Sequence, residues 1–425
     1  MSEPRQWPQV RLGDHATVKA RLGWKGLKAD EYVFDGPIFL AAPNLRNGRI
    51  DFENVDHIPQ WRFDESPEIQ LRDGDVLLVK DGSTLGISSL VRRLPGPTTV
   101  NGSIAVVRPK GDVEPGYLFY CINGQNFQRL IWLKKAGLGV PHLFQADLRE
   151  FQISLPNRSD QRRIAEILGT VDEAIEQTEA LIAKQQQVKA GLMHDLFTRG
   201  LTDDGQLRPT RAEAPDLYHE TPLGWLPNAW TPMPFGQCVS SFFLGTTRRG
   251  VGSSPETVPL LKMGNLTWGE LDVSDVEPLA VGKVVDVRHW LQSGDFLFNT
   301  RNTPELVGKT AVYRGEFDCC TYDNNLLRVR FKGGLDSRFV CYYMSHGRGQ
   351  QRVFTLATGT TSVAAIYWSA LARFHIPVPS QPSESVAIAA RVDSARAVLA
   401  AETARLAKLR QLKQALMQAL LTPPS

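Results

Sequence analysis

The sequence predicts a mixed α/β chain (α+β) in which two globular units, related by a pseudo-twofold repeat, are separated by two long antiparallel coiled-coil helices. Three observations carry this prediction: an internal repeat with a period near 222 residues, two apolar stripes with helical spacing, and short apolar runs between glycine, proline and aspartate. The expected segments are residues 1–158 (first globular unit), 159–200 (spacer helix), 201–211 (linker), 212–381 (second globular unit) and 382–425 (second spacer helix).

The repeat consists of five pairs of short segments that recur in the same order, at offsets of 220 to 224 residues. The pairs are Asn44–Gly48 with Asn265–Gly269, Gly74–Leu78 with Gly294–Phe298, Tyr117–Asn123 with Phe339–Ser345, Phe151–Pro156 with Phe374–Pro379, and Val188–Thr198 with Leu412–Thr422. Each pair alone is a weak match. Five pairs that keep their order indicate a duplication.

Each globular unit is expected to mix strands and helices. In the first unit we expect strands at Val76–Val79 and Ile104–Val107, a turn at Val100–Gly102 and one short helix over Tyr117–Gln128. The second unit repeats this pattern at Asp295–Phe298, Leu326–Phe331 and Ser337–Ser345.

The first long helix is expected to begin near Asp160, with Ser159 as its cap, and to stop at Gly200. Apolar residues in both helices mostly alternate at spacings of four and three over about five heptads, which is typical of a coiled-coil seam, and Val188 is taken to bridge one gap. The predicted packing residues are Ile164, Leu168, Val171, Ile175, Ile182, Leu192 and Leu196 in the first helix, and Ile388, Val392, Leu399, Leu406, Leu409, Leu416 and Leu420 in the second. A stripe of roughly 55 Å is too long for one small domain to cover, so the two helices are expected to pack on each other, antiparallel.

Three polar residues fall in this seam: Thr178, Gln185 and Glu402. They either form layers that set the register of the two helices or face solvent where the helices diverge. The polar stretch Lys184–Lys189 is either a solvated face or a surface that meets another protein chain.

Catalytic motifs are missing from the sequence. Gly308–Thr310 ends like a phosphate-binding loop, but Thr303 stands where the first glycine of that loop is required. No aspartate or glutamate stands two residues before any lysine, as in many nucleases, and no Asn/Asp-Pro-Pro-aromatic motif of adenine methyltransferases occurs. The eight histidines are scattered. We therefore expect a non-catalytic chain.

The cysteines and the apolar runs suggest a cellular compartment. The five cysteines are an odd number without a C-x-x-C pair, which favours reduced thiols and argues against a zinc site. The apolar runs are too short to span a membrane, and the first residues show no apolar leader. We expect a cytoplasmic chain. The net charge of +3 permits a nucleic-acid partner without predicting one.

The helix sequences resemble a known family. DQRRIAEILGTVDEAIEQTEALI (Asp160–Ile182) and KAGLMHDLFTRG (Lys189–Gly200) resemble the central region of the specificity subunits of type I restriction-modification enzymes, and LGWLPNAW (Leu223–Trp230) resembles the entry to their second recognition domain. The second helix departs from the first in charge, because Asp172–Glu176 corresponds to Arg396–Ala400. That difference puts the docking of a partner on the second helix in doubt.

The resemblance implies a division of labour. Each globular unit would be a target recognition domain that reads one half of a bipartite target in double-stranded DNA, and the helices would fix the spacer and dock two modification subunits. It also implies that this chain carries no cofactor or metal. S-adenosylmethionine, ATP and Mg would be bound by the modification subunits and the restriction/translocase subunits.

No base-contacting residue follows from the resemblance, so candidates come from side-chain chemistry. Arginine and lysine read guanine, asparagine reads adenine, and all three bind phosphates. The candidates are Arg46, Lys80 and Asn101 in the first unit, and Arg248, Arg249, Arg301, Asn302 and Asn324 in the second. The alternative is that each is a surface residue without base contact. Gly137–Gly139 and Thr358–Thr361 are either loops that approach phosphate or ordinary turns.

Three hypotheses for the function follow. The main one is a non-catalytic, sequence-specific DNA-recognition subunit of a type I methylation and restriction complex. The second is an assembly scaffold with degenerate recognition domains, against which the basic and amide-rich loops count mildly. The third is a self-contained enzyme, such as a nuclease fused to a specificity domain, and the missing motifs argue against it.

Overall fold

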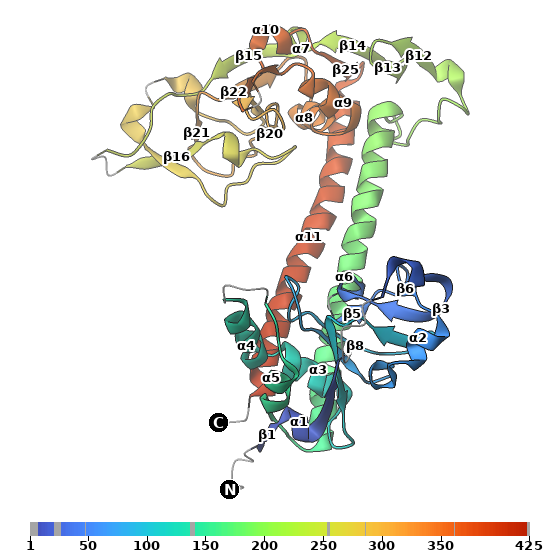
Figure 1. Cartoon of the computed structure of the whole chain (residues 1–425). Coiled ribbons are helices and arrows are strands. Elements are labelled where there is room, and N and C mark those ends of the chain that lie inside the picture. Colours follow the sequence, from blue (N-terminus) through green and yellow to red (C-terminus); the bar gives the residue numbers. More distant parts are fainter. Residues whose placement is uncertain are drawn as a thin grey trace. The chain divides into compact units, whose positions relative to one another are not determined.

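The computed structural model describes residues 7–20, 27–46, 48–136, 141–252, 256–284, 286–360 and 362–422. The chain forms two compact units (Figure 1): unit 1 contains Met1–Ala180 and Thr403–Ser425, and unit 2 contains Leu181–Glu402. Each unit therefore combines a globular part with portions of both long helices. The two units divide both long helices between them, so they do not correspond to the five predicted segments. The finer division into five segments stays a prediction.

Unit 1 is built on a four-stranded antiparallel sheet in the order β2 (Ala16–Lys19), β10 (Ile104–Pro109), β7 (Val76–Val79) and β8 (Ser88–Leu90). Successive side chains of a strand point to opposite faces. Val76 and Leu78 accordingly pack on α3 (Pro115–Asn123) and the start of the first long helix, whereas Leu77 and Val79 pack on a second core. Every residue of β7 is thus buried, which explains its unbroken apolar sequence.

Unit 2 repeats this architecture with β15 (Val239–Leu244), β22 (Leu326–Phe331), β18 (Phe296–Asn299) and β20 (Thr310–Val312) in the same order. A smaller sheet with one parallel pair accompanies each four-stranded sheet. In unit 1 it is β6 (Asp56–His57), β3 (Val33–Leu40) and β9 (Thr98–Val100), and in unit 2 it is β17 (Glu277–Ala280), β16 (Thr257–Leu261) and β21 (Thr321–Tyr322). The shared topology agrees with the duplication inferred from sequence.

Each main sheet also contains the same buried ion pair. Asp75 follows the turn before β7 and accepts hydrogen bonds from Arg108 Nε (2.7 Å) and Nη2 (2.8 Å) on β10. In unit 2, Asp295 and Arg330 form the equivalent pair, with an Nε–Oδ1 distance of 2.5 Å. These hydrogen bonds raise the pKa of both arginines. Both carboxylates are almost fully buried, so the pairs tie two strands of each sheet at matching points.

The remaining elements surround the sheets. In unit 1 they are β1 (Gln9–Arg11), β4 (Leu45–Arg46), β5 (Arg49–Ile50), β11 (Gln152–Ser154), α1 (Leu12–His15), α2 (Gln60–Asp64), α4 (Gln125–Lys135), α5 (Gln145–Glu150) and short 3₁₀ turns. In unit 2 they are β12 (Tyr218–Thr221), β13 (Gly224–Pro227), β14 (Trp230–Pro234), β19 (Arg301–Asn302), β23 (Thr358–Gly359), β24 (Ala364–Ala365), β25 (His375–Pro379), α7 (Phe235–Cys238), α8 (Ser337–Ser345), α9 (Gly347–Phe354), α10 (Trp368–Leu371) and further 3₁₀ turns.

The single helix predicted over Tyr117–Gln128 is wrong, because the chain forms α3 and α4 instead. Gly124 separates them in an extended conformation (φ −70°, ψ 161°), and its N–H donates to Cys121 O (3.1 Å). Glycine lacks the side chain that favours a continuous helix, and it readily ends one helix and begins the next.

The two long helices are α6 (Arg158–Thr198) and α11 (Pro382–Leu421). The predicted cap of α6, Ser159, is wrong. Asn157 Oδ1 accepts from the N–H of Asp160 (2.9 Å), because a cap must stand just before the first helical residue. At the other end Gly200 adopts φ +64°, the left-handed conformation that terminates helices.

The helices are antiparallel in both units. In unit 1, Lys413 pairs with Asp172 (2.6 Å) and Arg410 pairs with Glu179 (2.7 Å). The residue numbers of α11 therefore decrease along the pair of helices as those of α6 increase. In unit 2, Glu384 at the start of α11 accepts from the N–H of Leu201, just beyond the end of α6. The predicted packing residues Ile164, Leu168, Val171, Leu196, Ile388, Val392 and Leu406 are buried, whereas Ile175, Ile182, Leu192, Leu399, Leu409, Leu416 and Leu420 are half-buried.

One seam assignment is wrong, and one open alternative is decided by burial. Val188 is 54% exposed and does not bridge the seam. Lys189 takes that place, since Gln185, Lys189 and Leu192 keep the spacing of four and three. Burial lowers the pKa of the Lys189 ammonium. Thr178 is buried and its hydroxyl donates to Ala174 O (2.7 Å), so it does not face solvent.

Glu384 organises the start of α11 within unit 2. Its Oε1 accepts from Leu201 N (2.8 Å), Trp230 Nε1 (2.9 Å) and Arg208 Nη1 (2.5 Å). The Glu384 side chain is almost fully buried, so the N–H groups of Leu201 and Trp230 depend on it for a partner, while Arg208 Nη1 also donates to Arg199 O (3.1 Å).

Replacing Glu384 by alanine should lower the free energy of unfolding of unit 2 by about 3 kcal/mol, because it removes the carboxylate that pairs with Arg208 and leaves the Trp230 N–H without a partner. Urea unfolding followed by tryptophan fluorescence measures the change. The control is Glu220→Ala at an exposed site, which should stay within about 0.5 kcal/mol of the parent. An equal effect of both substitutions would contradict this role.

Candidate nucleic-acid interface

In unit 1 the chain turns at Lys80, the candidate residue that directly follows β7. We call this turn, which is closed by two backbone hydrogen bonds of Lys80, the corner of unit 1. The Lys80 N–H donates to Ser103 O (2.8 Å) and the Lys80 carbonyl accepts from Leu143 N (2.9 Å). Its Nζ donates to Asp81 (2.6 Å), and Asp81 also contacts His142 Nδ1. The Lys80 side chain is only 14% exposed. Its charge therefore serves an internal network of three residues rather than standing free at the surface.

The other candidates of unit 1 lie apart from each other. Asn101 Oδ1 accepts from the Ser103 N–H (3.1 Å) and hydroxyl (2.6 Å), so this side chain shapes the turn before β10. Arg46 is exposed on β4, and its Nε donates to Pro43 O (3.2 Å). The structure does not place Arg46 in the corner of Lys80.

Unit 2 forms the same corner after β18. The Thr300 N–H donates to Asn325 O (2.8 Å), and the Thr300 carbonyl accepts from Ile366 N (2.9 Å). Arg301 follows and is exposed. Asn302 Oδ1 accepts from the next backbone N–H, that of Thr303 (2.8 Å). The corner thus repeats in backbone geometry while its side chains differ from those of unit 1.

Two candidates of unit 2 contact each other. Arg249 Nη2 donates to Asp323 Oδ2 (3.1 Å) and to Asn324 Oδ1 (3.1 Å), while its Nη1 donates to Thr246 O (3.0 Å). Burial raises the pKa of the Asp323 carboxyl, and Arg249 is its charged partner. Arg248 lies exposed beside this network.

Unit 2 contains a cavity of about 730 Å³ that is lined by two of the candidate residues. Arg301 and Asn324 both line it, together with the aromatic residues Phe242, Tyr367 and Trp368. The rings of Phe242 and Trp368 stack with centroids 3.7 Å apart and planes at 19°. The sequence analysis missed these aromatic residues, although Phe242-Phe243 and Tyr367-Trp368 are adjacent aromatic pairs beside polar loops.

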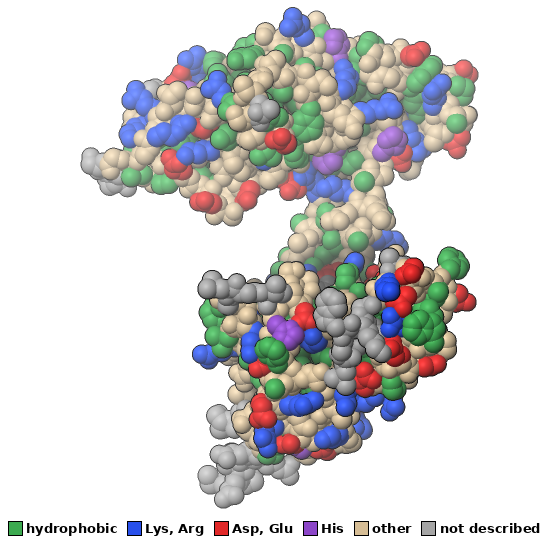
Figure 2. Space-filling model, in the orientation of Figure 1, with side chains coloured by type: hydrophobic (Ala, Val, Ile, Leu, Met, Phe, Trp, Pro, Cys, Tyr) green, Lys and Arg blue, Asp and Glu red, His purple; other side chains and the backbone are tan. Residues whose placement is uncertain are grey.

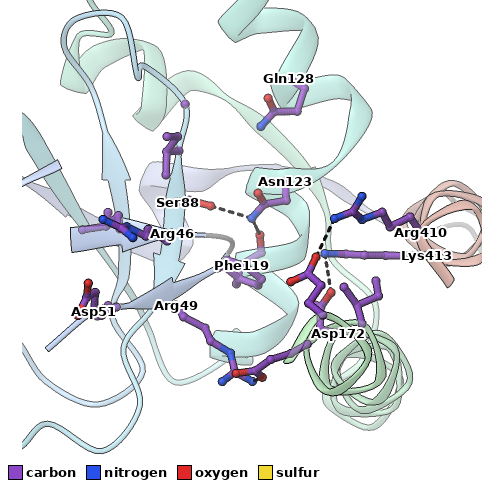
Figure 3. A pocket seen from close by; sticks show the side chains of 18 residues that line it. Arg46, Arg49, Asp51, Ser88, Phe119, Asn123, Gln128, Asp172, Arg410 and Lys413 are labelled. Atoms are coloured by element: carbon purple, nitrogen blue, oxygen red, sulfur yellow. Dashed lines mark hydrogen bonds and ion pairs between the residues drawn. The ribbon is translucent and has the colours of Figure 1, made fainter. Parts of the chain in front are cut away.

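Unit 1 contains a cavity of about 930 Å³ between the β4–β5 hairpin and the helices of the same unit (Figure 3). Arg410 and Lys413 project from α11 toward acidic residues of α6, and Lys413 pairs with Asp172. Arg49 on β5 contacts Glu176. Tyr120 donates to Asp172 (2.8 Å). Basic and acidic groups thus pair across this cavity, unlike in the aromatic cavity of unit 2.

Charge alone does not mark the interface. On the face drawn in Figure 2, Lys and Arg side chains are interspersed with Asp and Glu side chains over both units. This distribution agrees with the small net charge of +3. A DNA-contacting surface therefore has to be identified from local chemistry and not from one large basic patch.

Two further observations bear on the chemistry of the chain. Within the described ranges, no three His, Cys, Asp or Glu residues come together as metal ligands would. The described helices also lack any stretch with the length and apolar character needed to cross a membrane. The loop Gly137–Gly139 and residue Thr361, proposed as phosphate loops, lie outside the described residues.

One segment of the chain matches the model of a known protein family. Residues 4–186 match the family model described as the type I restriction modification DNA specificity domain. Residues 4–186 are thus similar to the DNA specificity domains of type I restriction-modification systems. Recognition of DNA sequence for a type I restriction-modification system is the function of such a specificity domain, and the resemblance noted in the helix sequence is confirmed.

Similarity to specificity subunits extends over most of the chain. The StySPI specificity subunit of Salmonella potsdam is 20% identical, with 82% of this chain and 73% of the relative covered. The EcoKI specificity subunit of Escherichia coli K12 is 22% identical, with 77% and 68% covered. The MjaVIII specificity subunit of Methanocaldococcus jannaschii is 23% identical, with 99% and 93% covered.

Two solved structures share the fold of this chain. The S subunit of a type I restriction-modification system from M. genitalium matches with a TM-score of 0.61 at 11% identity, covering 100% of this chain and 98% of that one. A chain from a structure on complex assembly and conformational transition of the type I R-M system matches with a TM-score of 0.53 at 19% identity, and 99% of each chain is covered. The expected fold, mixed α/β units with long helices, is confirmed.

The thiols provide a test of the folded state. Burial raises the pKa of Cys121, Cys320 and Cys341 to about 12 each and also raises the pKa of Cys238, whereas Cys319 is exposed. At pH 8 we expect one thiol per folded chain to react rapidly with Ellman's reagent and all five to react in denaturant, because only thiolates attack the reagent. Cys319→Ser should remove the fast phase. A second fast thiol in that variant would contradict the assignment.

Proposed function

We propose that the chain is the non-catalytic recognition subunit of a type I restriction-modification complex and directs it to a bipartite target in double-stranded DNA. Each globular unit reads one half-site. The observation that carries this proposal is the repeated corner after β7 and β18, where matching backbone hydrogen bonds present different side chains in the two units. One fold used twice with different surface residues supports a target of two unequal halves.

The long helices supply the second part of the proposal. They fix the spacer between the half-sites and dock two modification subunits, with restriction/translocase subunits joining the complex. Support comes from the exposed polar stretches that the seam leaves free, such as Lys184 and Gln186–Gln187 on α6. Catalysis belongs to the partner chains, which bind S-adenosylmethionine, ATP and Mg. The complex works in the cytoplasm, where reduced cysteines are stable.

Co-expression of this chain with its modification subunit should methylate adenines within one two-part motif with a fixed gap. The physical reason is that the proposed spacer helices would hold the two reading units at one separation along the duplex. Long-read sequencing that detects N6-methyladenine measures the motif. If the complex assembles and binds S-adenosylmethionine yet methylates no motif, the chain is an assembly scaffold with degenerate recognition domains.

Inserting seven residues into both helices should lengthen the gap of the motif by about three base pairs. Seven helical residues add about 10 Å, and successive base pairs rise about 3.4 Å. Insertions after Gln186 in α6 and after Ala401 in α11 place the added turns at exposed positions on facing stretches. The matched control inserts seven residues into α6 alone, which should abolish methylation because the seam loses register. An unchanged gap in the double insertion would refute the spacer role.

A further inference from the structure

Two exposed aromatic residues occupy the same place in the two repeats. Phe144 directly precedes α5 and is 59% exposed, while Tyr367 directly precedes α10 and is 60% exposed. Each lies one residue beyond the backbone hydrogen bond that closes the corner, made by Leu143 in unit 1 and Ile366 in unit 2. These exposed rings contribute little to the hydrophobic core of either unit. Because an exposed ring occurs at the same position in both units, we infer that this position belongs to a contact surface.

In unit 2 the exposed ring belongs to a formed cavity. Tyr367 lines the cavity of about 730 Å³ beside the stacked rings of Phe242 and Trp368. Arg301 and Asn324 line the same cavity. We call these five residues the aromatic platform of unit 2. It combines flat apolar faces with one guanidinium and one amide.

This combination matches the chemistry of a nucleobase. An aromatic ring binds the face of an unstacked base, which contributes about 1–3 kcal/mol per base in single strands, and in a duplex a ring also packs on the methyl group of thymine in the major groove. Arginine donates to the O6 and N7 edge of guanine, and asparagine pairs with the edge of adenine. Asn324 Oδ1 already accepts from Arg249, which leaves its amide N–H groups as donors toward a ligand. The polar groups can therefore read the edge of a base that the rings hold.

In unit 1 the exposed ring of Phe144 has different neighbours. The His142 ring lies 4.3 Å from it in an edge arrangement, and Lys134 Nζ lies 5.9 Å from its centre. His142 is in turn held by Asp81, the residue after Lys80. Phe144, His142 and Lys134 form the aromatic platform of unit 1. It offers an aromatic face beside an imidazole and the Lys134 ammonium, which also pairs with Asp147 (2.9 Å), so it suits the same class of ligand with a different edge.

We propose that the two platforms are base-contact sites, and that Tyr367 and Phe144 each lie against a base of the half-site read by their own unit. This inference rests on the proposed function and adds to it the residues that touch DNA. Because the platforms occupy equivalent positions with different neighbours, each contributes specificity to one half-site only.

The test substitutes the two rings separately in the full chain, co-expressed with the modification subunit. Tyr367→Ala should lower the preference for the correct base at one position of one half-site by about tenfold or more, because a base–aromatic contact is lost. Phe144→Ala should do the same in the other half-site. Long-read mapping of N6-methyladenine reports the motif of each variant, and the unchanged half serves as an internal reference.

The chain offers matched controls. Phe34 in unit 1 and Trp225 in unit 2 are exposed aromatic residues away from the platforms, and Phe34→Ala and Trp225→Ala should keep the parent motif. Tyr367→Phe and Phe144→Tyr retain the ring and should also keep it. Thermal unfolding checks that each variant folds. If an alanine variant unfolds, the corresponding leucine variant removes the aromatic face while retaining apolar volume and takes its place.

The results separate the two proposals. A parent chain that gives no two-part motif overturns the proposed function, and this inference falls with it. A parent motif that stays unchanged in both ring variants overturns only the base-contact assignment. An equal loss of binding to target and non-target DNA, measured by gel shift of the assembled complex, also overturns that assignment, because it would place the rings on the DNA backbone.

Discussion

Both units depend on the antiparallel packing of α6 against α11, because neither helix can bury its apolar stripe alone. In unit 1 the core that covers the sheet contains Ile164 and Leu168 of α6, and Leu416 of α11 packs against it. In unit 2 the corresponding core contains Leu196 of α6 and Ile388 of α11. The helices are therefore parts of the two hydrophobic cores. A recognition unit that shares its core with a stiff helix keeps a defined orientation on that helix.

The sequence predicted the elements in which local pattern and tertiary packing agree. Strands Val76–Val79 and Leu326–Phe331 have the predicted bounds, and the continuous apolar run of the first fits a strand that is buried on both faces. The break at Gly124 was missed because aromatic spacing continues across it. Lys189 was missed as a seam residue because the gap between Gln185 and Leu192 was assigned to the apolar Val188, whereas a lysine stem can also lie along an apolar surface.

The candidate site could be predicted only in part, since a sequence does not show which polar groups already have partners. Asn101 shapes its own turn and Lys80 binds Asp81, while Arg301 is exposed at the aromatic cavity. The exposed Tyr367 was missed for the opposite reason, because apolar residues are assigned to a core by default. Only the repeat in three dimensions shows that Phe144 holds the equivalent position.

Duplication explains how one fold can present different side chains at matching points, as the proposed reading of two half-sites requires. The backbone of each corner is constrained by the same hydrogen bonds, at Lys80 in unit 1 and Thr300 in unit 2, so the positions of the following side chains are set by the sheet. The identity of those side chains is unconstrained by the core. Asp81 and Arg301 accordingly differ in charge at matching points without any change in topology. The exposed side chains can therefore diverge between the units while the ion pairs of Asp75 and Asp295 and the packing of the long helices stay the same.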